Sequence, residues 1–205
     1  MITHSQPYVR KDERRAMIAQ AARELILENG YAALRTRDVA ARVGINISTL
    51  HFHVPSKTAL VALVAETTRD SFLAMLPPAP DPARPARVQL RAEAQAYRDS
   101  LRDRPELAAC FMQLTQTSGI EPNVAAVLES FTRGWCQRYA DILAIGQAQE
   151  VFRADLSPFP AAIAMTGALT AFGHRGSNGL EMFWPVFDEI ERGFLAAPGK
   201  EESVR

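Results

Sequence analysis

The stretch GINISTLHFHVPSKTAL, residues 44–60, decides how the N-terminal part of this chain folds. Gly44 is typical of the end of a helix, and Asn46 is typical of the cap that opens the next one. The helix that Asn46 opens would run to about Phe52 and bury Leu50 on one side. The polar and aromatic side chains of the stretch would then lie on the outer side, as expected of a helix that contacts another molecule.

Helices are expected on both sides of this stretch. On the N-terminal side, apolar residues recur at helical spacing over residues 14–30, and the segment 36–44 offers Thr36 as an N-cap. On the C-terminal side, Ser56 would cap a long helix that begins at Lys57. Two short helices, joined by a tight turn and placed between longer ones, are the layout of a helix-turn-helix, whose second short helix enters the major groove of DNA.

The outer face of this second short helix would carry polar side chains that can contact DNA. Ser48 and Thr49 can exchange hydrogen bonds with base edges, and His51 and His53 can bond to phosphates or bases. Lys57 would add a cation at the start of the following helix, where backbone N–H groups already favour an anion. These residue types favour DNA binding, although the spacing of a helix-turn-helix also arises by chance in unrelated proteins.

Two apolar residues of the same helix have two interpretations each. A helical offset of about 200° from Leu50 favours an outward position for Phe52, from which its ring could pack on a thymine methyl group. The alternative is a core position, which is usual for an aromatic residue in a small three-helix domain. Ile47 could likewise contact a thymine methyl group or simply be a partly exposed apolar residue.

Charge is distributed unevenly along the chain. The formal net charge of the 205 residues is zero, which by itself argues against a nucleic-acid-binding protein. Residues 1–57, however, carry nine Lys and Arg against five Asp and Glu, and the remaining residues carry 14 against 18. A basic N-terminal part joined to a neutral or acidic body agrees with DNA binding by the N-terminal part, although an excess of this size could arise by chance.

The rest of the chain has helical periodicity, and no segment alternates with the two-residue period of a strand. The sequence LPPAPDPARP, residues 76–85, interrupts the helices, because its prolines cannot continue one. We therefore predict an all-α protein of about nine helices, with a helix-turn-helix DNA-binding domain over residues 1–60 and a larger helical domain over residues 77–205. The helix that begins near residue 57 would continue to about residue 76 as a connector. The later helices are expected over residues 84–102, 105–119, 122–149, 161–174 and 181–196.

Several classes of protein are disfavoured by the sequence. The N-terminal residues lack the apolar core of a signal peptide, and no run of about 18 apolar residues suggests a membrane span, so a cytoplasmic protein is expected. Cys110 and Cys136 lie in apolar-periodic segments without metal-like spacing, which predicts buried thiols. No Gly-x-Ser-x-Gly elbow or phosphate-binding loop occurs, so we expect neither an enzyme nor a cofactor.

Residues 10–63 resemble the DNA-binding domain of the TetR family of bacterial transcriptional regulators. The family pattern has a helix ending in glycine, a threonine opening a second helix, an alanine-rich segment, a glycine-containing turn, a TLY-like triplet with aromatic or histidine residues after it, and a Ser-Lys pair before a leucine. The rest of the chain is similar to the family in size, in helix count and in the FRADLSP loop before an apolar helix. The matching residues, which follow in order without gaps over about a quarter of the chain, are Gly30-Tyr31, Thr36, Val39-Ala40, Val43-Gly44-Ile45, Thr49-Leu50-His51, Phe52-His53-Val54, and Ser56-Lys57 with Leu60.

The resemblance implies DNA contacts from Thr36, which can also act simply as a cap, and from its neighbour Arg37. Three positions depart from the family pattern, so the base preference of relatives does not transfer. His51 stands where a tyrosine usually contacts a phosphate, Ser48 replaces a frequent glycine, and Ile47 replaces a frequent polar residue. Because an imidazole binds phosphate more strongly when protonated, the contact from His51 could depend on pH. The predicted DNA-contacting residues are Thr36, Arg37, Ile47, Ser48, Thr49, His51, Phe52, His53 and Lys57.

The resemblance also implies a homodimer, formed by the last two helices as a four-helix bundle, that binds a pseudo-palindromic operator. The expected helix over residues 161–174 is apolar nearly all round, which a surface helix of a monomer would not tolerate. A helix buried inside a monomer is the alternative. The predicted interface residues are Ala164, Ala168, Ala171, Phe183, Phe187, Ile190 and Phe194.

Finally, the resemblance implies a small-molecule pocket in the larger domain, whose occupation changes the spacing of the two DNA-binding domains and releases the protein, usually a repressor, from DNA. An apolar, aromatic body favours a hydrophobic or aromatic effector. The alternative is a dimeric regulator without a small-molecule effector, controlled by a protein partner or by its abundance. The predicted lining residues, each of which could equally be a plain core or helix-terminal residue, are Phe111, Met112, Gln113, Trp135, Tyr139, Met165 and His174.

Overall fold

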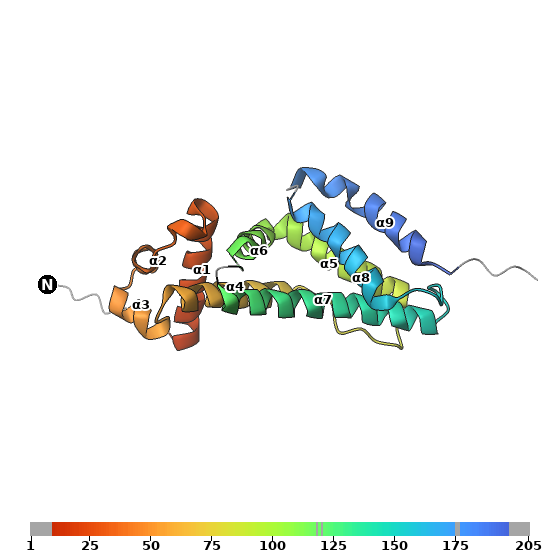
Figure 1. Ribbon diagram of the computed structural model, residues 1–205, viewed down its shortest axis with the longest axis horizontal. Coiled ribbons are helices and arrows are strands. Elements are labelled where there is room, and N and C mark those ends of the chain that lie inside the picture. The colour runs from red at the N-terminus through yellow and green to blue at the C-terminus, as the bar shows by residue number, and fades with distance from the viewer. Residues whose placement is uncertain (1–9, 118, 120, 175–176, 197–205) are drawn as a thin grey trace, which may run out of the picture. The chain divides into compact units, whose positions relative to one another are not determined.

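The computed structural model describes residues 10–117, 119, 121–174 and 177–196, and most of them are helical. These residues form nine α-helices and three short 3-10 helices and contain no strand, which confirms the predicted all-α class (Figure 1). None of the described helices is both long enough and apolar enough to span a bilayer. The elements are α1 (Lys11–Asn29), η1 (Tyr31–Ala33), α2 (Thr36–Val43), α3 (Ile47–His53), α4 (Lys57–Leu73), α5 (Ala86–Asp103), α6 (Pro105–Thr117), α7 (Pro122–Ala148), α8 (Pro158–Thr170), η2 (Ala171–His174), η3 (Ser177–Met182) and α9 (Phe183–Phe194).

The chain divides into two compact units. The first consists of the chain up to Ser71 together with Ala109–Glu129, and the second of Phe72–Ala108 together with the chain from Ser130 onward. The first unit therefore takes in more of the chain than residues 1–60. The unit boundaries fall inside α4, α6 and α7, so each of these helices contributes residues to both units.

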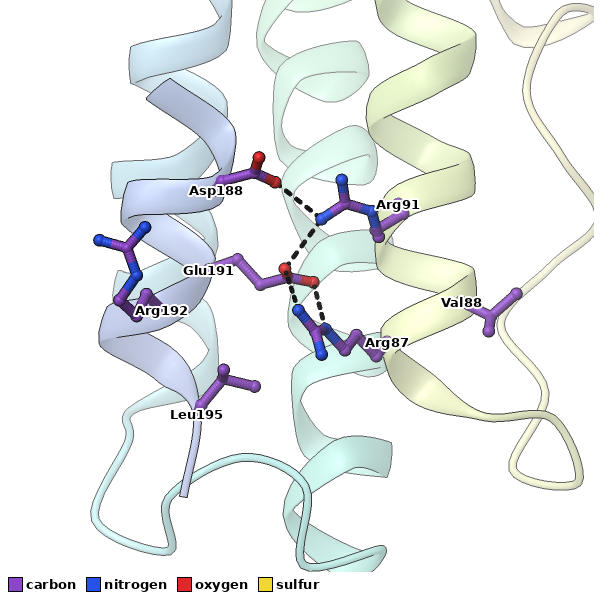
Figure 2. A pocket seen from close by; sticks show the side chains of 7 residues that line it. All are labelled: Arg87, Val88, Arg91, Asp188, Glu191, Arg192 and Leu195. Carbon is purple, nitrogen blue, oxygen red and sulfur yellow. Dashed lines mark hydrogen bonds and ion pairs between the residues drawn. The ribbon is translucent and has the colours of Figure 1, made fainter. Parts of the chain in front are cut away.

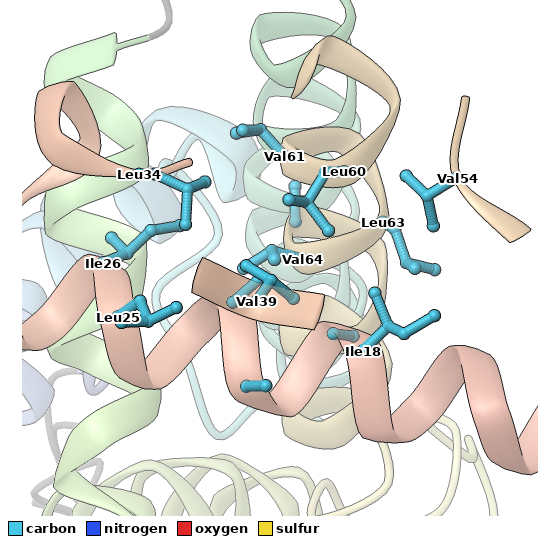
Figure 3. Close-up of a cluster of buried hydrophobic side chains, with 14 of the residues drawn as sticks. Ile18, Leu25, Ile26, Leu34, Val39, Val54, Leu60, Val61, Leu63 and Val64 are labelled. Carbon is cyan, nitrogen blue, oxygen red and sulfur yellow. The ribbon is translucent and has the colours of Figure 1, made fainter. Parts of the chain in front are cut away.

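One hydrophobic core holds the first unit together (Figure 3). On α1, Ile18, Ala22 and Ile26 recur at helical spacing and are fully buried, as the sequence periodicity predicts. Both cysteine predictions are confirmed, because Cys110 and Cys136 are buried free thiols. The core also includes residues of α2, α3, α4, α6 and α7: Val39, Ala40, Leu50, Leu60, Val61, Val64, Cys110, Leu114, Val124 and Leu128.

Most helix ends of the first unit lie where the sequence predicts them. Gly30 ends α1 with a positive φ of 79°, which a glycine adopts without strain. The side chain of Ser56 accepts a hydrogen bond of 3.0 Å from the backbone N–H of Ala59 and so caps α4. The predicted N-cap of α2 is wrong by one residue: Arg35, in extended backbone, occupies the cap position without a side-chain cap bond, and Thr36 is already helical.

Aromatic side chains form the centre of the second unit. Trp135 of α7 has its ring centroid 5.0 Å from that of Tyr97, 5.6 Å from Phe72 and 5.7 Å from Tyr139. Phe183, at the start of α9, lies against Tyr97 with the ring centroids 6.4 Å apart. Because Trp135, Tyr139 and Phe183 are almost completely buried, this cluster anchors α5, α7 and α9 to one another.

The end of α7 packs tightly against the loop that follows it. A Cβ atom at Gly146 would lie 2.0 Å from a ring carbon of Phe152, so only glycine fits there. The carbonyl of Gly146 accepts hydrogen bonds from the backbone N–H groups of Val151 and Phe152. The loop is shorter than the predicted one, because α8 already begins at Pro158, a residue suited to a first helical turn.

The proline-rich break between α4 and α5 is confirmed and is well ordered by side-chain hydrogen bonds. Gln89 of α5 accepts from the backbone N–H of Asp81 at 2.8 Å and donates to the carbonyl of Arg84 at 3.0 Å. Gln149 accepts from the backbone N–H of Ala86 at 2.9 Å. That bond satisfies one of the free N–H groups at the start of α5.

Ion pairs join α5 to α9 (Figure 2). The buried carboxylate of Glu191 accepts two hydrogen bonds from Arg87, at 3.1 and 3.0 Å, and one from Arg91 at 2.9 Å. Arg91 also donates to Asp188 at 2.8 Å and lies over the ring of Trp184. Because the carboxylates and the two arginines satisfy one another, we interpret this arrangement as a tie between the helices. The groove beside it has a volume of about 640 Å³ and is lined by Arg87, Val88, Arg91, Asp188, Glu191, Arg192 and Leu195.

Candidate nucleic-acid interface

The turn between α2 and α3 has the tight geometry of a helix-turn-helix. Gly44 adopts the left-handed conformation, with φ 74° and ψ 32°, which a residue with a side chain rarely adopts. The backbone N–H of Ile45 donates back to the carbonyl of Ala40 at 3.0 Å. Asn46 then caps α3, because its side-chain oxygen accepts from the backbone N–H of Thr49 at 2.7 Å. The local signals read from residues 44–49 therefore act as predicted.

The two sides of α3 differ sharply in exposure. Leu50 is completely buried in the core of the first unit, whereas Phe52 is 77% exposed and Ile47 is 41% exposed. Ser48 and His51 are also exposed. The open question about Phe52 is thereby answered, because its ring lies outside the core, as its helical offset from Leu50 predicts. A large apolar ring held in solvent on a short polar helix favours a surface that is covered by another molecule.

Basic residues of α1 surround the end of α3. Arg15 donates to the backbone carbonyl of His53 at 2.7 Å, across 38 positions in the sequence. Burial, and then the charges of Arg14, Lys11 and Arg15, lower the pKa of His53. His53 is therefore neutral at neutral pH, and the positive charge at this end of α3 comes from α1. The basic residues at the start of α1 thus lie beside the end of α3.

Lys57, at the start of α4, is predicted to bind a phosphate. In the free protein its side chain is held by Tyr31. Its ammonium group donates to the backbone carbonyl of Tyr31 at 3.2 Å and lies 4.5 Å from the centroid of the Tyr31 ring. The hydroxyl of Tyr31 in turn donates to Glu121 at 2.6 Å, and burial together with this bond raises the pKa of Tyr31 to about 12. Sequence reasoning missed this chain of contacts, because Tyr31 and Glu121 lie 90 positions apart.

The other predicted DNA-contacting residues lie on the surface of the first unit to different degrees. Thr36, at the start of α2, and Thr49, on α3, are half-buried. Arg37 is exposed and forms a loose ion pair of 3.5 Å with Asp38. The ring of His51 is exposed and has its Nδ1 atom 3.2 Å from the carbonyl oxygen of Pro55. Exposure thus leaves Arg37 and His51 available to a partner.

The predicted ligand-lining residues do not all belong to one unit. Phe111, Met112 and Gln113 belong to the first unit and are half-buried, whereas the other four belong to the second. Of these four, Trp135, Tyr139 and Met165 are buried, but His174, at the end of η2, is exposed.

The predicted interface residues also fall into two groups. On α8, Ala164 is exposed and Ala168 is half-buried, and Ala171, the first residue of η2, is exposed. On α9, Phe183 and Phe187 are completely buried and Phe194 is nearly so, while Ile190 is half-buried. The phenylalanines therefore pack inside their own chain, whereas small residues of α8 remain exposed.

Comparison with known proteins agrees with this geometry. Residues 18–64 match the family model of bacterial regulatory proteins, tetR family. The HTH-type transcriptional activator FasR from Mycolicibacterium smegmatis is 26% identical over 144 residues, which are 70% of this chain and 65% of that protein. The match therefore spans slightly less than two thirds of the length of this relative.

Solved structures share the fold over most of the chain. A bacterial regulatory protein in the tetR family from Rhodococcus RHA1 is 21% identical, with a TM-score of 0.75 over 91% of this chain and 99% of that one. A protein from Saccharomonospora viridis, solved in complex with choline, is 22% identical, with a TM-score of 0.75 over 91% of this chain and all of the other. At these identities the likeness shows the fold.

Proposed function

The N-terminal domain belongs to the tetR family of bacterial regulatory proteins, and from this we propose that the chain is a transcriptional regulator that binds a DNA operator as a homodimer. The observation that carries the proposal is the asymmetry of α3. Its inner side is anchored by the buried Leu50, and its outer side presents Ile47, Ser48, His51 and Phe52. A short helix with one anchored and one exposed side suits the major groove.

Each predicted DNA-contacting residue of the first unit has a role in this proposal. Ser48 and Thr49 exchange hydrogen bonds with base edges, and Phe52 and Ile47 pack on thymine methyl groups. His51 and His53, together with Thr36, Arg37 and Lys57, bind the phosphate backbone, which fixes the position of the helix in the groove.

We propose that two copies associate through α8. Its outer side is apolar and exposed, with Ile163 51% exposed and Ala164 and Gly167 open to solvent, as is Ala171 directly after the helix. Small residues allow the backbones of two helices to approach closely, and an exposed apolar stripe is typical of a protein–protein interface. A two-fold axis through such an interface would present two copies of α3 to a pseudo-palindromic operator.

We further propose that a small effector binds in the second unit and lowers the affinity for the operator. Such coupling requires the effector to bind more tightly to the conformation that does not hold DNA. The solved complex of the S. viridis protein with choline supports a ligand-binding role for this fold. A regulator controlled by a protein partner or by its abundance would bind the operator without responding to small molecules.

The test is binding of the purified protein to DNA from upstream of its own gene, followed by fluorescence anisotropy over a series of salt concentrations. We expect selective binding of two protomers per site, with an affinity that falls steeply with salt. The double variant His51→Ala/Phe52→Ala should lose selectivity. The control Val88→Ala, which also shortens an exposed apolar side chain but lies on α5, should bind as wild type does. Equal, weak binding to all fragments in a genome-wide selection would refute the proposal.

The direction of regulation follows from a separate measurement. The family resemblance predicts repression, whereas the relative from M. smegmatis is a transcriptional activator. A reporter gene placed behind the operator, with and without the protein, decides between the two by the sign of the change in expression.

A further inference from the structure

Four buried side-chain polar atoms of the second unit have no hydrogen-bond partner among the described residues; one is the Nε atom of the half-buried Arg98, and the other three lie on side chains that are almost completely buried. These three are the Oε2 atom of Glu93, the Nε1 atom of Trp135 and the hydroxyl oxygen of Tyr139. The three side chains are 1%, 3% and 0% exposed, so solvent does not reach them. Buried polar groups in proteins are almost always paired, and these three unpaired atoms on fully buried side chains point to a partner that the chain itself does not supply.

These atoms belong to side chains on the facing sides of α5 and α7. Arg138 donates to the Oε1 atom of Glu93, from its Nε at 3.0 Å and also from its Nη2, so only Oε2 is left over. The rings of Trp135 and Tyr139, one helical turn apart on α7, are in edge contact with centroids 5.7 Å apart. Burial and then the nearby charge of Glu93 raise the pKa of Tyr139, which places the two groups within electrostatic reach.

The chemistry of the three atoms restricts what can pair with them. The indole N–H of Trp135 only donates. Burial raises the pKa of Glu93 and the bonds from Arg138 oppose that shift, and in its ionised form the carboxylate only accepts. The hydroxyl of Tyr139 can do either. A hydroxyl group on a ligand both accepts and donates, so it can satisfy Trp135 and Glu93 together, whereas a methyl group can satisfy neither.

The walls around these atoms are aromatic. Phe72 contacts Trp135 edge-on, with the ring centroids 5.6 Å apart, and Phe131 stacks on it at 6.4 Å. Such rings bind an apolar or aromatic body, while the polar atoms select its substituent.

We propose that the second unit binds a small aromatic or apolar ligand that carries a hydroxyl group, which is held between Glu93 on α5 and Trp135 and Tyr139 on α7. This inference rests on the proposed function in one respect: the ligand would be the effector of the regulator. Entry of the ligand requires the buried rings to move apart. Because α7 is one continuous helix whose first residues, 122–129, belong to the first unit, a movement of α7 would also reach the core of that unit.

The experiment compares ligands of nearly equal shape that differ only in the hydroxyl group. Phenol is paired with toluene, and 4-ethylphenol with 4-ethyltoluene. The protein is the full chain with Trp184→Phe, which leaves Trp135 as the single tryptophan, so that quenching of its fluorescence and the thermal shift both report binding. We expect each phenol to bind about tenfold more tightly than its methyl partner, because the methyl group would leave buried polar atoms unpaired.

A hydroxyl deletion in the protein tests the assignment to these side chains. Tyr139→Phe should raise the melting temperature of the free protein, because it removes an unpaired buried hydroxyl, and should reduce the preference for phenols several-fold. Glu93→Gln, in the same background, should reduce it as well. The matched control is Tyr97→Phe, whose hydroxyl lies toward Gly173 and which should keep the preference.

Two results would overturn the inference. One is the absence of any preference for the phenols, in which case the polar atoms belong to the packed core alone. The other is an equal loss of preference in Tyr97→Phe, which would assign the effect to looser packing. Both measurements are made without DNA, so a failure to bind the operator would refute the proposed function and leave this result standing. Tight binding of phenols that leaves operator affinity unchanged would remove only the role as effector.

Discussion

Replacing Phe52 by alanine separates a role in reading DNA from a role in stability. The ring is 77% exposed in the free protein, so little apolar surface is lost to the core by its removal. We expect the free energy of unfolding of Phe52→Ala to stay within about 0.5 kcal/mol of wild type, as for other surface substitutions. Leu50→Ala, two residues away and completely buried, should lose about 2–5 kcal/mol.

The expected loss of operator affinity follows from the exposed area. A phenylalanine side chain offers roughly 200 Å², so its exposed part amounts to about 150 Å². If half of that area is covered in the major groove, about 75 Å² at ~25 cal/mol per Å² corresponds to about 2 kcal/mol. This free energy corresponds to a loss of roughly 25-fold in affinity, since 1.4 kcal/mol is tenfold.

The assay is fluorescence anisotropy with the operator and with copies in which single thymines are replaced by deoxyuridine, which lacks the methyl group. With wild-type protein, the substitution at the contacted position should cost about 0.8 kcal/mol, the value of one buried methyl-sized group. With Phe52→Ala the same substitution should cost nothing, because the contact is already gone. The reasoning is refuted if Phe52→Ala binds the operator within about twofold of wild type, or if no thymine position distinguishes the two proteins.

Three further predictions concern the stability of the fold and are measured by urea or thermal unfolding. Gly146→Ala should destabilise the protein by about 1–3 kcal/mol, because the added methyl group would overlap the buried ring of Phe152. The control Gly134→Ala has nothing within 4 Å of its added Cβ and should stabilise α7 by about 0.5–1 kcal/mol. Equal effects of the two substitutions would contradict the packing at the end of α7. Glu191→Gln should cost about 2–3 kcal/mol, because it removes the buried charge that two arginines share, and the control Glu189→Gln, on an exposed ion pair, should cost less than about 1 kcal/mol. Because the pKa of His53 is lowered, the unfolded chain binds a proton at this residue more readily than the folded one, and the protein should become less stable as the pH falls below about 6.5. His53→Gln should flatten the dependence of the unfolding free energy on pH in this range. An unchanged dependence would argue against the lowered pKa.

Local signals are the part of this structure that the sequence predicts well. The residues that end or cap the helices act within four residues of their own position, through backbone conformation or a short side-chain hydrogen bond; they are Gly30, Gly44, Asn46 and Ser56. Their effect can therefore be predicted without knowledge of the rest of the fold. The outward position of Phe52 belongs to the same class, since it follows from the helical offset from Leu50.

Contacts between distant parts of the chain are the part that the sequence does not reveal. The hydrogen bond from Arg15 to the carbonyl of His53 and the ion pair of Arg138 with Glu93 join residues 38 and 45 positions apart. Helical periodicity shows that a residue faces a core, but it does not show which element covers it. For this reason the phenylalanines of α9 were expected at a dimer interface, whereas they pack inside their own chain.

Parts of α6 and α7 belong to the same unit as the helix-turn-helix. The core of this unit contains Leu114 of α6 and Val124 and Leu128 of α7, in addition to the helix-turn-helix, so the start of α7 is part of the unit that carries α3. Tyr31, which binds Glu121 just before α7, also holds Lys57, a predicted phosphate contact at the start of α4. A shift of α7 relative to α4 would therefore alter the surroundings of Lys57 without any movement inside α3. In the functions proposed above, α7 links the two sites, because Trp135 and Tyr139, in the middle of this helix, belong to the second unit.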